Sequence, residues 1–62
     1  MTVRDILQVS DSSVLVEVVE ISTGLLICPP DWVGYYLTLD QSVLDEEVIT
    51  ITIIDSILCI GV

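Results

Sequence analysis

Residues 48–62 read Val-Ile-Thr-Ile-Thr-Ile-Ile-Asp-Ser-Ile-Leu-Cys-Ile-Gly-Val, and this stretch decides the fold. Isoleucine alternates with threonine in its first half, which predicts a β-strand over residues 48–54. The Asp55-Ser56 pair predicts a tight turn, after which the chain returns as a second strand over residues 57–62. The stretch therefore predicts an antiparallel hairpin.

A two-residue turn also fixes the register of this hairpin, with Ile54 opposite Ile57. One continuous aliphatic face is then built from three cross-strand pairs, which are Ile53 with Leu58, Ile51 with Ile60, and Ile49 with Val62. A slip by one residue would exchange the two faces, so burial of the aliphatic face holds the register. The run 48–54 has high β propensity and carries no charge, and natural sheets cover or pair such an edge.

An earlier strand–turn–strand unit is expected as well. Residues 14–21 are rich in valine and largely apolar on both faces, which is typical of a central strand. The Ser-Thr-Gly turn at residues 22–24 can take a positive φ at its glycine. Residues 25–28 return as the second strand, and we expect the two prolines at 29–30 to end it, because neither can donate a ladder hydrogen bond.

A short helix is expected before these strands. Thr2 can cap it, with Asp5 three residues later as the second half of a capping box. Val3, Ile6 and Leu7 fall on one face at helical spacing. Because so short a helix is marginal in isolation, we expect this apolar stripe to pack on the sheet.

The segment 31–39 holds all of the aromatic side chains, which are Trp32, Tyr35 and Tyr36. We expect a loop here that closes into a short strand over residues 35–39. Aromatic residues are enriched at the energetic centres of protein interfaces, which makes Trp32 a candidate anchor for a partner. The alternatives are that Trp32 covers an open end of the core, and that the tyrosines pack in the core or in a dimer interface.

Asp40 predicts the N-cap of a helical turn, and Leu39 and Leu44 lie where a hydrophobic staple would place them. The turn runs into three carboxylates at residues 45–47, where a helix dipole favours cations. Local conflicts of this kind are expected at functional surfaces.

The order of elements is helix, hairpin, aromatic segment with a helical turn, and hairpin. This order predicts a single α+β domain over residues 1–62. We expect the short N-terminal helix to pack on an antiparallel sheet of about four strands, formed by the two hairpins.

Hydrophobic residues make up 53% of the 62 residues, and the mean hydropathy is +0.92. A chain of this length buries only about 60% of the surface that its unfolded form exposes. The apolar surplus therefore predicts cover by a partner, a second copy or a membrane. A membrane span is disfavoured, because the longest uncharged stretch, residues 21–30, is short and contains a glycine and two prolines. With no signal peptide visible, we expect a cytoplasmic protein.

Ten carboxylates face one cationic side chain, Arg4, and the formal net charge is −9. Nucleic acids and anionic lipid surfaces are disfavoured as direct partners, because Lys and Arg are needed to neutralise their phosphates. A basic protein surface is the electrostatic complement of this chain. The alternative is that the acidity only keeps an apolar protein in solution.

Residue types that carry catalysis are scarce. Histidine is absent, and the sequence contains no nucleotide-binding or metalloprotease motif. Cys28 and Cys59 lack a metal-type spacing, and we expect both to be small buried thiols rather than a disulfide. The acidic residues lack the spacing and the glycine of a calcium-binding loop. We therefore expect a non-enzymatic protein with no cofactor and no bound metal.

Two segments carry a resemblance to known proteins. Residues 1–7, Met-Thr-Val-Arg-Asp-Ile-Leu, precede a valine-rich strand, and residues 44–48, Leu-Asp-Glu-Glu-Val, lead into the last hairpin. With the strands that follow them, they resemble a loose group of small acidic proteins encoded by bacteriophages and mobile elements of Gram-positive bacteria. The resemblance implies a genomic setting in which short acidic proteins inhibit host defence, as anti-CRISPR proteins do, and a place in the host cytoplasm.

The first functional hypothesis is a protein inhibitor that occupies a basic groove of a host-defence protein, such as a CRISPR effector, as a nucleic-acid mimic does. Such binding should weaken steeply as salt rises. The binding residues would be four carboxylates and two aromatic anchors: Asp40, Asp45, Glu46, Glu47, Trp32 and Tyr35.

The second hypothesis is a structural or accessory subunit that forms a homodimer, in which the charge only maintains solubility. Its interface would combine the aliphatic face of the last hairpin with one tyrosine: Ile49, Ile51, Ile53 and Tyr36. The third is a protein that sequesters a small molecule between subunits. A phosphate-bearing ligand is disfavoured there, because only Arg4 and backbone amides could neutralise it.

Overall fold

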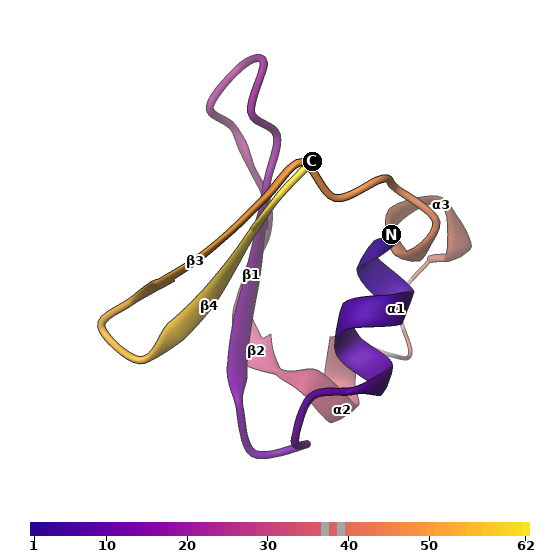
Figure 1. Cartoon of the computed structure of the whole chain (residues 1–62), viewed down its shortest axis with the longest axis vertical. Coiled ribbons are helices and arrows are strands. Elements are labelled where there is room, and N and C mark those ends of the chain that lie inside the picture. The colour runs from indigo at the N-terminus through magenta and orange to yellow at the C-terminus, as the bar shows by residue number, and fades with distance from the viewer. Residues whose placement is uncertain (37, 39) are drawn as a thin grey trace.

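The computed structural model describes residues 1–36, 38 and 40–62. Within them, a four-stranded mixed sheet carries three short helices on one of its faces (Figure 1), which confirms the expected α+β class. The elements in chain order are α1 (Val3–Gln8), β1 (Leu15–Val19), β2 (Leu26–Trp32), α2 (Val33–Tyr36), α3 (Gln41–Leu44), β3 (Thr50–Ile54) and β4 (Ile57–Gly61).

The strands lie in the order β2-β1-β4-β3, so β1 and β4 are central. β1 pairs antiparallel with β2, and β3 with β4, as the two expected hairpins require. The two hairpins meet through β1 and β4, which run parallel, so the expectation of a purely antiparallel sheet was wrong. The chain passes through α2 and α3 before β3 begins, and a connection of this length allows a parallel pairing.

The hairpin of β3 and β4 has the register that the sequence predicts. The confirmed pairs are Ile54 with Ile57, Ile53 with Leu58, and Ile51 with Ile60. The expected pair of Ile49 with Val62 is not formed, because the ladder ends at Thr50 with Gly61 and the Ile49 N–H donates to the Gly61 carbonyl at 2.7 Å. Asp55 and Ser56 form the turn, with φ values of 50° and 66°. Positive φ at both central residues is typical of a type I′ turn, whose twist matches that of the two strands.

β2 differs from the expectation in its length. We expected Pro29 and Pro30 to end a strand over residues 25–28, whereas β2 runs through both prolines to Trp32. The prolines are tolerated because β2 is an edge strand and both lie in a register shift, between the pairs Val16–Asp31 and Val18–Cys28, where the regular ladder is interrupted. The pairing with β1 is also irregular, with register shifts on either side of Val18.

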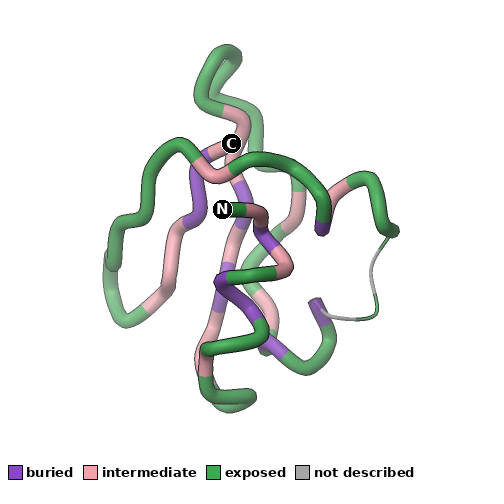
Figure 2. The backbone as a smooth tube through the Cα atoms, turned by 45° about the vertical axis from the view of Figure 1, so that its right-hand side comes forward, coloured by how far each residue is buried: buried purple, intermediate pink, exposed green. Residues whose placement is uncertain are grey.

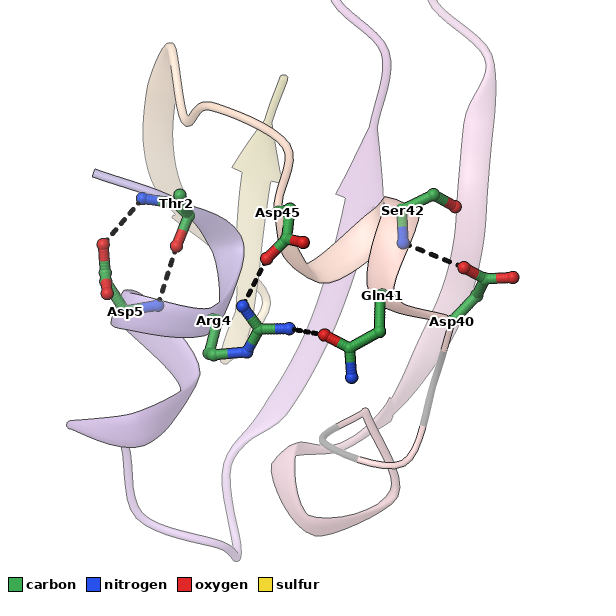
Figure 3. A network of polar contacts seen from close by, with 7 residues as sticks. All are labelled: Thr2, Arg4, Asp5, Asp40, Gln41, Ser42 and Asp45. Carbon is green, nitrogen blue, oxygen red and sulfur yellow. Dashed lines mark hydrogen bonds and ion pairs between the residues drawn. The ribbon is translucent and has the colours of Figure 1, made fainter.

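α1 begins as the sequence predicts. The Thr2 hydroxyl accepts a hydrogen bond from the Asp5 backbone N–H at 3.3 Å, and the Asp5 carboxylate accepts one from the Thr2 N–H at 2.9 Å. These two bonds form the expected capping box (Figure 3). The predicted apolar stripe is buried, since Val3, Ile6 and Leu7 are 0%, 8% and 1% exposed.

The aromatic segment folds differently from the expectation. Tyr35 and Tyr36 belong to α2, a helical turn directly after β2, and not to a strand. Val33 and Tyr36 are both buried, and a separation of three residues suits one face of a helix rather than the alternation of a strand.

α3 is the helical turn predicted after the aromatic segment. The Asp40 carboxylate caps it by accepting a hydrogen bond from the Ser42 N–H at 2.8 Å. Leu44, one partner of the expected staple, is buried. The other partner, Leu39, lies outside the described residues.

The core lies between the helices and one face of the sheet (Figure 2). Val16 and Val18 of β1 and Ile60 of β4 are each 0% exposed on that face. The helices contribute the other buried side chains, which are Val3, Ile6, Leu7, Val33, Tyr36 and Leu44. The accessible surface of 3801 Å² is close to the roughly 4,000 Å² expected for a monomer of this mass. The fold therefore buries an ordinary share of its surface, and part of the apolar surplus stays exposed to solvent.

Candidate protein-binding surface

The aliphatic face of the sheet continues beyond the helices. Residues paired across strands lie on the same face, so Ile51 and Ile53 share the helix-covered face with Ile60 and Leu58. Ile60 is 0% exposed, whereas Ile51 is 48% and Ile53 is 73% exposed. The core therefore extends towards β3 and ends there as exposed apolar surface.

β3 is exposed along its whole length. All five of its residues are exposed, and so is Ile49, which precedes the strand (Figure 2). Ile54 lies on the opposite face and is 56% exposed. The strand carries neither a charge nor a proline, which are two of the features that usually block pairing at an edge. We call residues 49–54 the open edge.

The backbone of the open edge offers hydrogen-bonding groups in addition to side chains. β3 is an outer strand of the described sheet, with β4 on its inner side. In an antiparallel hairpin, the residues that flank a two-residue turn exchange hydrogen bonds, and this exchange recurs at every second pair. Counting from Ile54, the N–H and C=O groups of Thr52 point towards β4, and those of Ile51 and Ile53 point away from the sheet.

Carboxylates lie at both ends of the open edge. Glu46 and Glu47 precede it and Asp55 follows it in the turn, and all three residues are exposed. Backbone hydrogen bonds of 3.0 Å and 2.8 Å join residues 1–3 to residues 46–48 and hold the first acidic pair in place. An uncharged strand thus lies between two acidic ends.

The face of the sheet opposite the helices carries an apolar row drawn from all four strands. In-register pairing aligns one residue of each strand across the sheet: Trp32, Leu15, Ile57 and Ile54. The two outer members of the row, Trp32 and Ile54, are 52% and 56% exposed. Sequence reasoning missed this row, because it depends on the parallel pairing of β1 with β4.

A thiol–carboxylate contact lies on the same face. Glu17 and Cys59 are cross-strand partners, and the Cys59 thiol donates a hydrogen bond to Glu17 Oε1 at 2.8 Å. This bond favours the protonated thiol and raises the pKa of Cys59, while burial raises the pKa of Cys28. Both cysteines are thiols, as expected, but each is half-buried rather than buried, and neither has the lowered pKa typical of a reactive cysteine.

The four carboxylates predicted to bind a partner are exposed and lie around α3 and the connection to β3: Asp40, Asp45, Glu46 and Glu47. Asp40 caps α3, and the hydrogen bond from Ser42 lowers the pKa of its carboxyl group. Asp45 pairs with the Arg4 guanidinium, which also donates to Gln41 Oε1 (Figure 3). Glu47 pairs with the N-terminal amine at 2.9 Å. Three of the four carboxylates therefore already have a partner within the chain.

The two predicted aromatic anchors are available at the surface. Trp32 and Tyr35 are 52% and 55% exposed. They lie at the end of β2 and on α2, whereas the four carboxylates lie at and after α3. Figure 1 shows α2 at the lower end of the helical layer and α3 at its upper end. The structure therefore does not bring the aromatic and acidic residues into one patch.

Tyr36, which we expected in an oligomer interface, lies in the core of its own chain and is 1% exposed. Its hydroxyl donates hydrogen bonds to the carbonyl oxygens of Cys28, at 2.9 Å, and of Pro29. Burial raises the pKa of this hydroxyl. Tyr36 therefore attaches α2 to β2, and its burial leaves it no surface to offer to a second copy.

Within residues 1–36, 38 and 40–62, the structure has no pocket, no group of three or more potential metal ligands, and no helix long and apolar enough to span a membrane. Comparison with protein-family models, with curated proteins and with solved structures found no match to this chain. The candidate surface is therefore defined by its own geometry, which combines the open edge with the carboxylates at its two ends.

Proposed function

We propose that this chain is a non-enzymatic protein-binding module whose main contact is the open edge. The observation that carries the proposal is β3, an outer strand with five exposed residues and no charge. Burial of apolar surface drives most protein association, and an unpaired strand edge adds main-chain hydrogen bonds to it.

The free energy gained by burying the isoleucines of the open edge can be compared with the cost of association. Fully burying one isoleucine contributes about 1.5–3 kcal/mol, so the four partly exposed isoleucines of the open edge contribute roughly 4–7 kcal/mol. Association of two proteins costs about 4–15 kcal/mol in lost translational and rotational freedom. The isoleucines alone therefore give weak binding, and backbone hydrogen bonds and charge must contribute the rest.

Charge selects the class of partner. The net charge of −9 favours association with a basic protein surface and opposes association with acidic ones. A defence protein that holds a nucleic acid presents such a surface. We extend the proposal to an inhibitor of a host-defence protein, which the resemblance to small acidic phage proteins supports and in which Glu46 and Glu47 would add charge to the apolar contact.

The experiment compares two double variants that add the same charge to the two outer strands. Ile51→Lys with Ile53→Lys changes the open edge, and Leu26→Lys with Ile27→Lys changes exposed residues of β2. Tagged proteins capture partners from a lysate of the native host, with identification by mass spectrometry. We expect the β2 variant to retain the wild-type partners and the β3 variant to lose them. If both variants retain the same partners, the open edge is not the contact and the proposal is wrong.

A homodimer is the second candidate, and one feature of the sequence favours it. Residues 48–54 are nearly symmetric about Ile51, so two antiparallel copies would bring Ile49 opposite Ile53 of the second copy and Thr50 opposite Thr52. Sedimentation equilibrium at low and high salt measures self-association and so separates the homodimer from the module that binds a basic partner. Screening of like charges tightens a homodimer as salt rises, whereas binding to a basic partner weakens.

A further inference from the structure

The two outer strands of the sheet differ in whether they can accept another strand. β2 carries Pro29 and Pro30, and its pairing is shifted on both sides of Val18. Prolines and bulges are features that block strand addition. β3 has five regularly paired residues without a proline or a register shift. A further strand can therefore pair with β3, whereas pairing with β2 is hindered.

The geometry of β3 specifies the length and pattern of an added strand. Five residues of an antiparallel strand span about 17 Å. An added strand would exchange hydrogen bonds with the outward-pointing backbone groups of Ile51 and Ile53. Its side chains beside these two isoleucines would extend the core face and need to be apolar, whereas those beside Thr50 and Thr52 can be polar.

The charges at the ends of β3 decide between a second copy and a different partner. In the symmetric register about Ile51, Glu47 would lie opposite Asp55 of the second copy at both ends of the pair. Like charges directly opposite each other destabilise a strand pair, and both chains carry a net charge of −9. A segment with cations at both ends would instead meet Glu46, Glu47 and Asp55 favourably.

We propose that β3 accepts, as a fifth strand, an extended segment of about five alternating apolar and polar residues with Lys or Arg at both ends. This inference rests on the proposed function, because it names the partner chemistry of the same open edge. The acidic ends then serve two purposes: they attract the basic segment and oppose pairing between copies of the chain.

Three synthetic peptides test the pattern with the intact protein. The basic peptide is Lys-Lys-Val-Thr-Val-Thr-Val-Lys-Lys. The acidic control replaces each lysine by glutamate, and the non-pairing control keeps the lysines but has proline in place of the central valine. Binding is followed by the amide shifts of the labelled protein in NMR titrations. We expect the basic peptide to shift β3 amides, to bind at least about tenfold more tightly than either control, and to weaken about tenfold between about 50 and 500 mM salt.

Two triple variants test the charges. Glu46→Gln, Glu47→Gln and Asp55→Asn neutralise the ends of the open edge, whereas Asp11→Asn, Glu20→Gln and Asp31→Asn remove the same charge elsewhere. The control amides keep an acceptor for the local hydrogen bonds to residues 13, 23 and 32. We expect only the first triple variant to lose about tenfold in affinity for the basic peptide and to self-associate more strongly.

The outcomes separate this inference from the proposed function. Equal binding of the acidic and basic peptides, or equal effects of the two triple variants, would show that charge does not select the partner, and the open edge would remain a contact. Equal binding of the basic and proline peptides would show attraction without strand pairing. Absence of binding by the basic peptide would also overturn the inference, whereas the proposed function depends on the capture experiment with the lysine variants.

Discussion

β2 and β3 are the two outer strands of one sheet, and each exposes apolar side chains. Leu26 of β2 is 49% exposed and Ile51 of β3 is 48% exposed, so exposure of apolar residues does not distinguish the two edges. The backbone does. β2 contains two prolines and an irregular pairing, whereas β3 is regular and keeps every N–H group. The comparison shows that the backbone hydrogen-bonding groups, and not the apolar exposure, distinguish the edge that we propose as the contact.

The two edges also differ in how they are attached to the rest of the molecule. Tyr36 packs under β2, and its hydroxyl donates hydrogen bonds to the Cys28 and Pro29 carbonyls. β3 is attached through its ladder with β4, and its five residues are all exposed. The blocked edge is therefore anchored to the core by a buried side chain, and the open edge is anchored chiefly by backbone pairing.

The largest expected effect follows from this difference in attachment. Tyr36→Ala removes a buried aromatic ring and two hydrogen bonds, and we expect the free energy of unfolding to fall by about 3–5 kcal/mol. Ile53→Ala, on the open edge, removes a side chain that is 73% exposed and should cost less than about 1 kcal/mol. Urea denaturation of both variants measures the difference. Similar losses would show that β3 is as firmly packed as β2.

Tyr36→Phe separates the ring from its hydroxyl. The ring still fills the core, but the two carbonyl oxygens lose their donor, so we expect a loss of about 1–3 kcal/mol in the same measurement. A variant as stable as the wild type would show that the hydroxyl does not hold α2 against β2.

The next prediction transfers a proline from the blocked edge to the open one. Ile53→Pro removes an N–H that points away from the sheet, whereas Thr52→Pro removes one that points towards β4. We expect Thr52→Pro to cost about 3 kcal/mol in stability and Ile53→Pro much less, because only the first loses a ladder hydrogen bond. Equal losses in urea denaturation would contradict the backbone orientation assigned to the open edge.

Local rules predicted the elements that depend on neighbouring residues. The Asp55-Ser56 turn fixed the register of its hairpin, and Thr2 with Asp5 fixed the start of α1. The same local reasoning failed at Pro29, because whether a proline ends a strand depends on whether that strand lies at an edge. Edge position follows from the strand order, which is set by contacts between residues far apart in the chain.

Local patterns likewise predicted only the parts of the candidate site that depend on neighbouring residues. The uncharged run 48–54 and the acidic residues around it are visible in the sequence, and the structure places that run at the sheet edge. The apolar row from Trp32 to Ile54 required the parallel pairing, which no local pattern indicates. The sequence left Tyr36 open between the core and a dimer interface, and choosing the core required recognising that it shares a helical face with Val33.

A further prediction compares the glycines of the two hairpins. A Cβ at Gly61 would overlap the Thr50 hydroxyl and Ile21, so Gly61→Ala should cost about 1–3 kcal/mol. Gly24→Ala meets no atom within 4 Å, but its φ of +73° costs an L-residue about 1–2 kcal/mol. Adding Thr50→Ala should recover part of the first loss and none of the second. Equal recovery in both double variants would show that Gly61 is not needed for the approach of β3 to β4.

The smallest expected effect concerns the two thiols, one on β2 and one on β4, which is the inner neighbour of β3. Cys28 lies on β2, where burial raises its pKa, and Cys59 lies on β4, where the hydrogen bond to Glu17 raises it. A raised pKa lowers the thiolate fraction at a given pH, so both thiols should react slowly with iodoacetamide at about pH 8. Glu17→Gln removes the negative charge beside Cys59, so the pKa of Cys59 should fall and its alkylation should accelerate, while the rate at Cys28 stays unchanged. Peptide mapping by mass spectrometry follows the two rates separately, and an unchanged rate at Cys59 would show that the contact between β1 and β4 does not control this thiol.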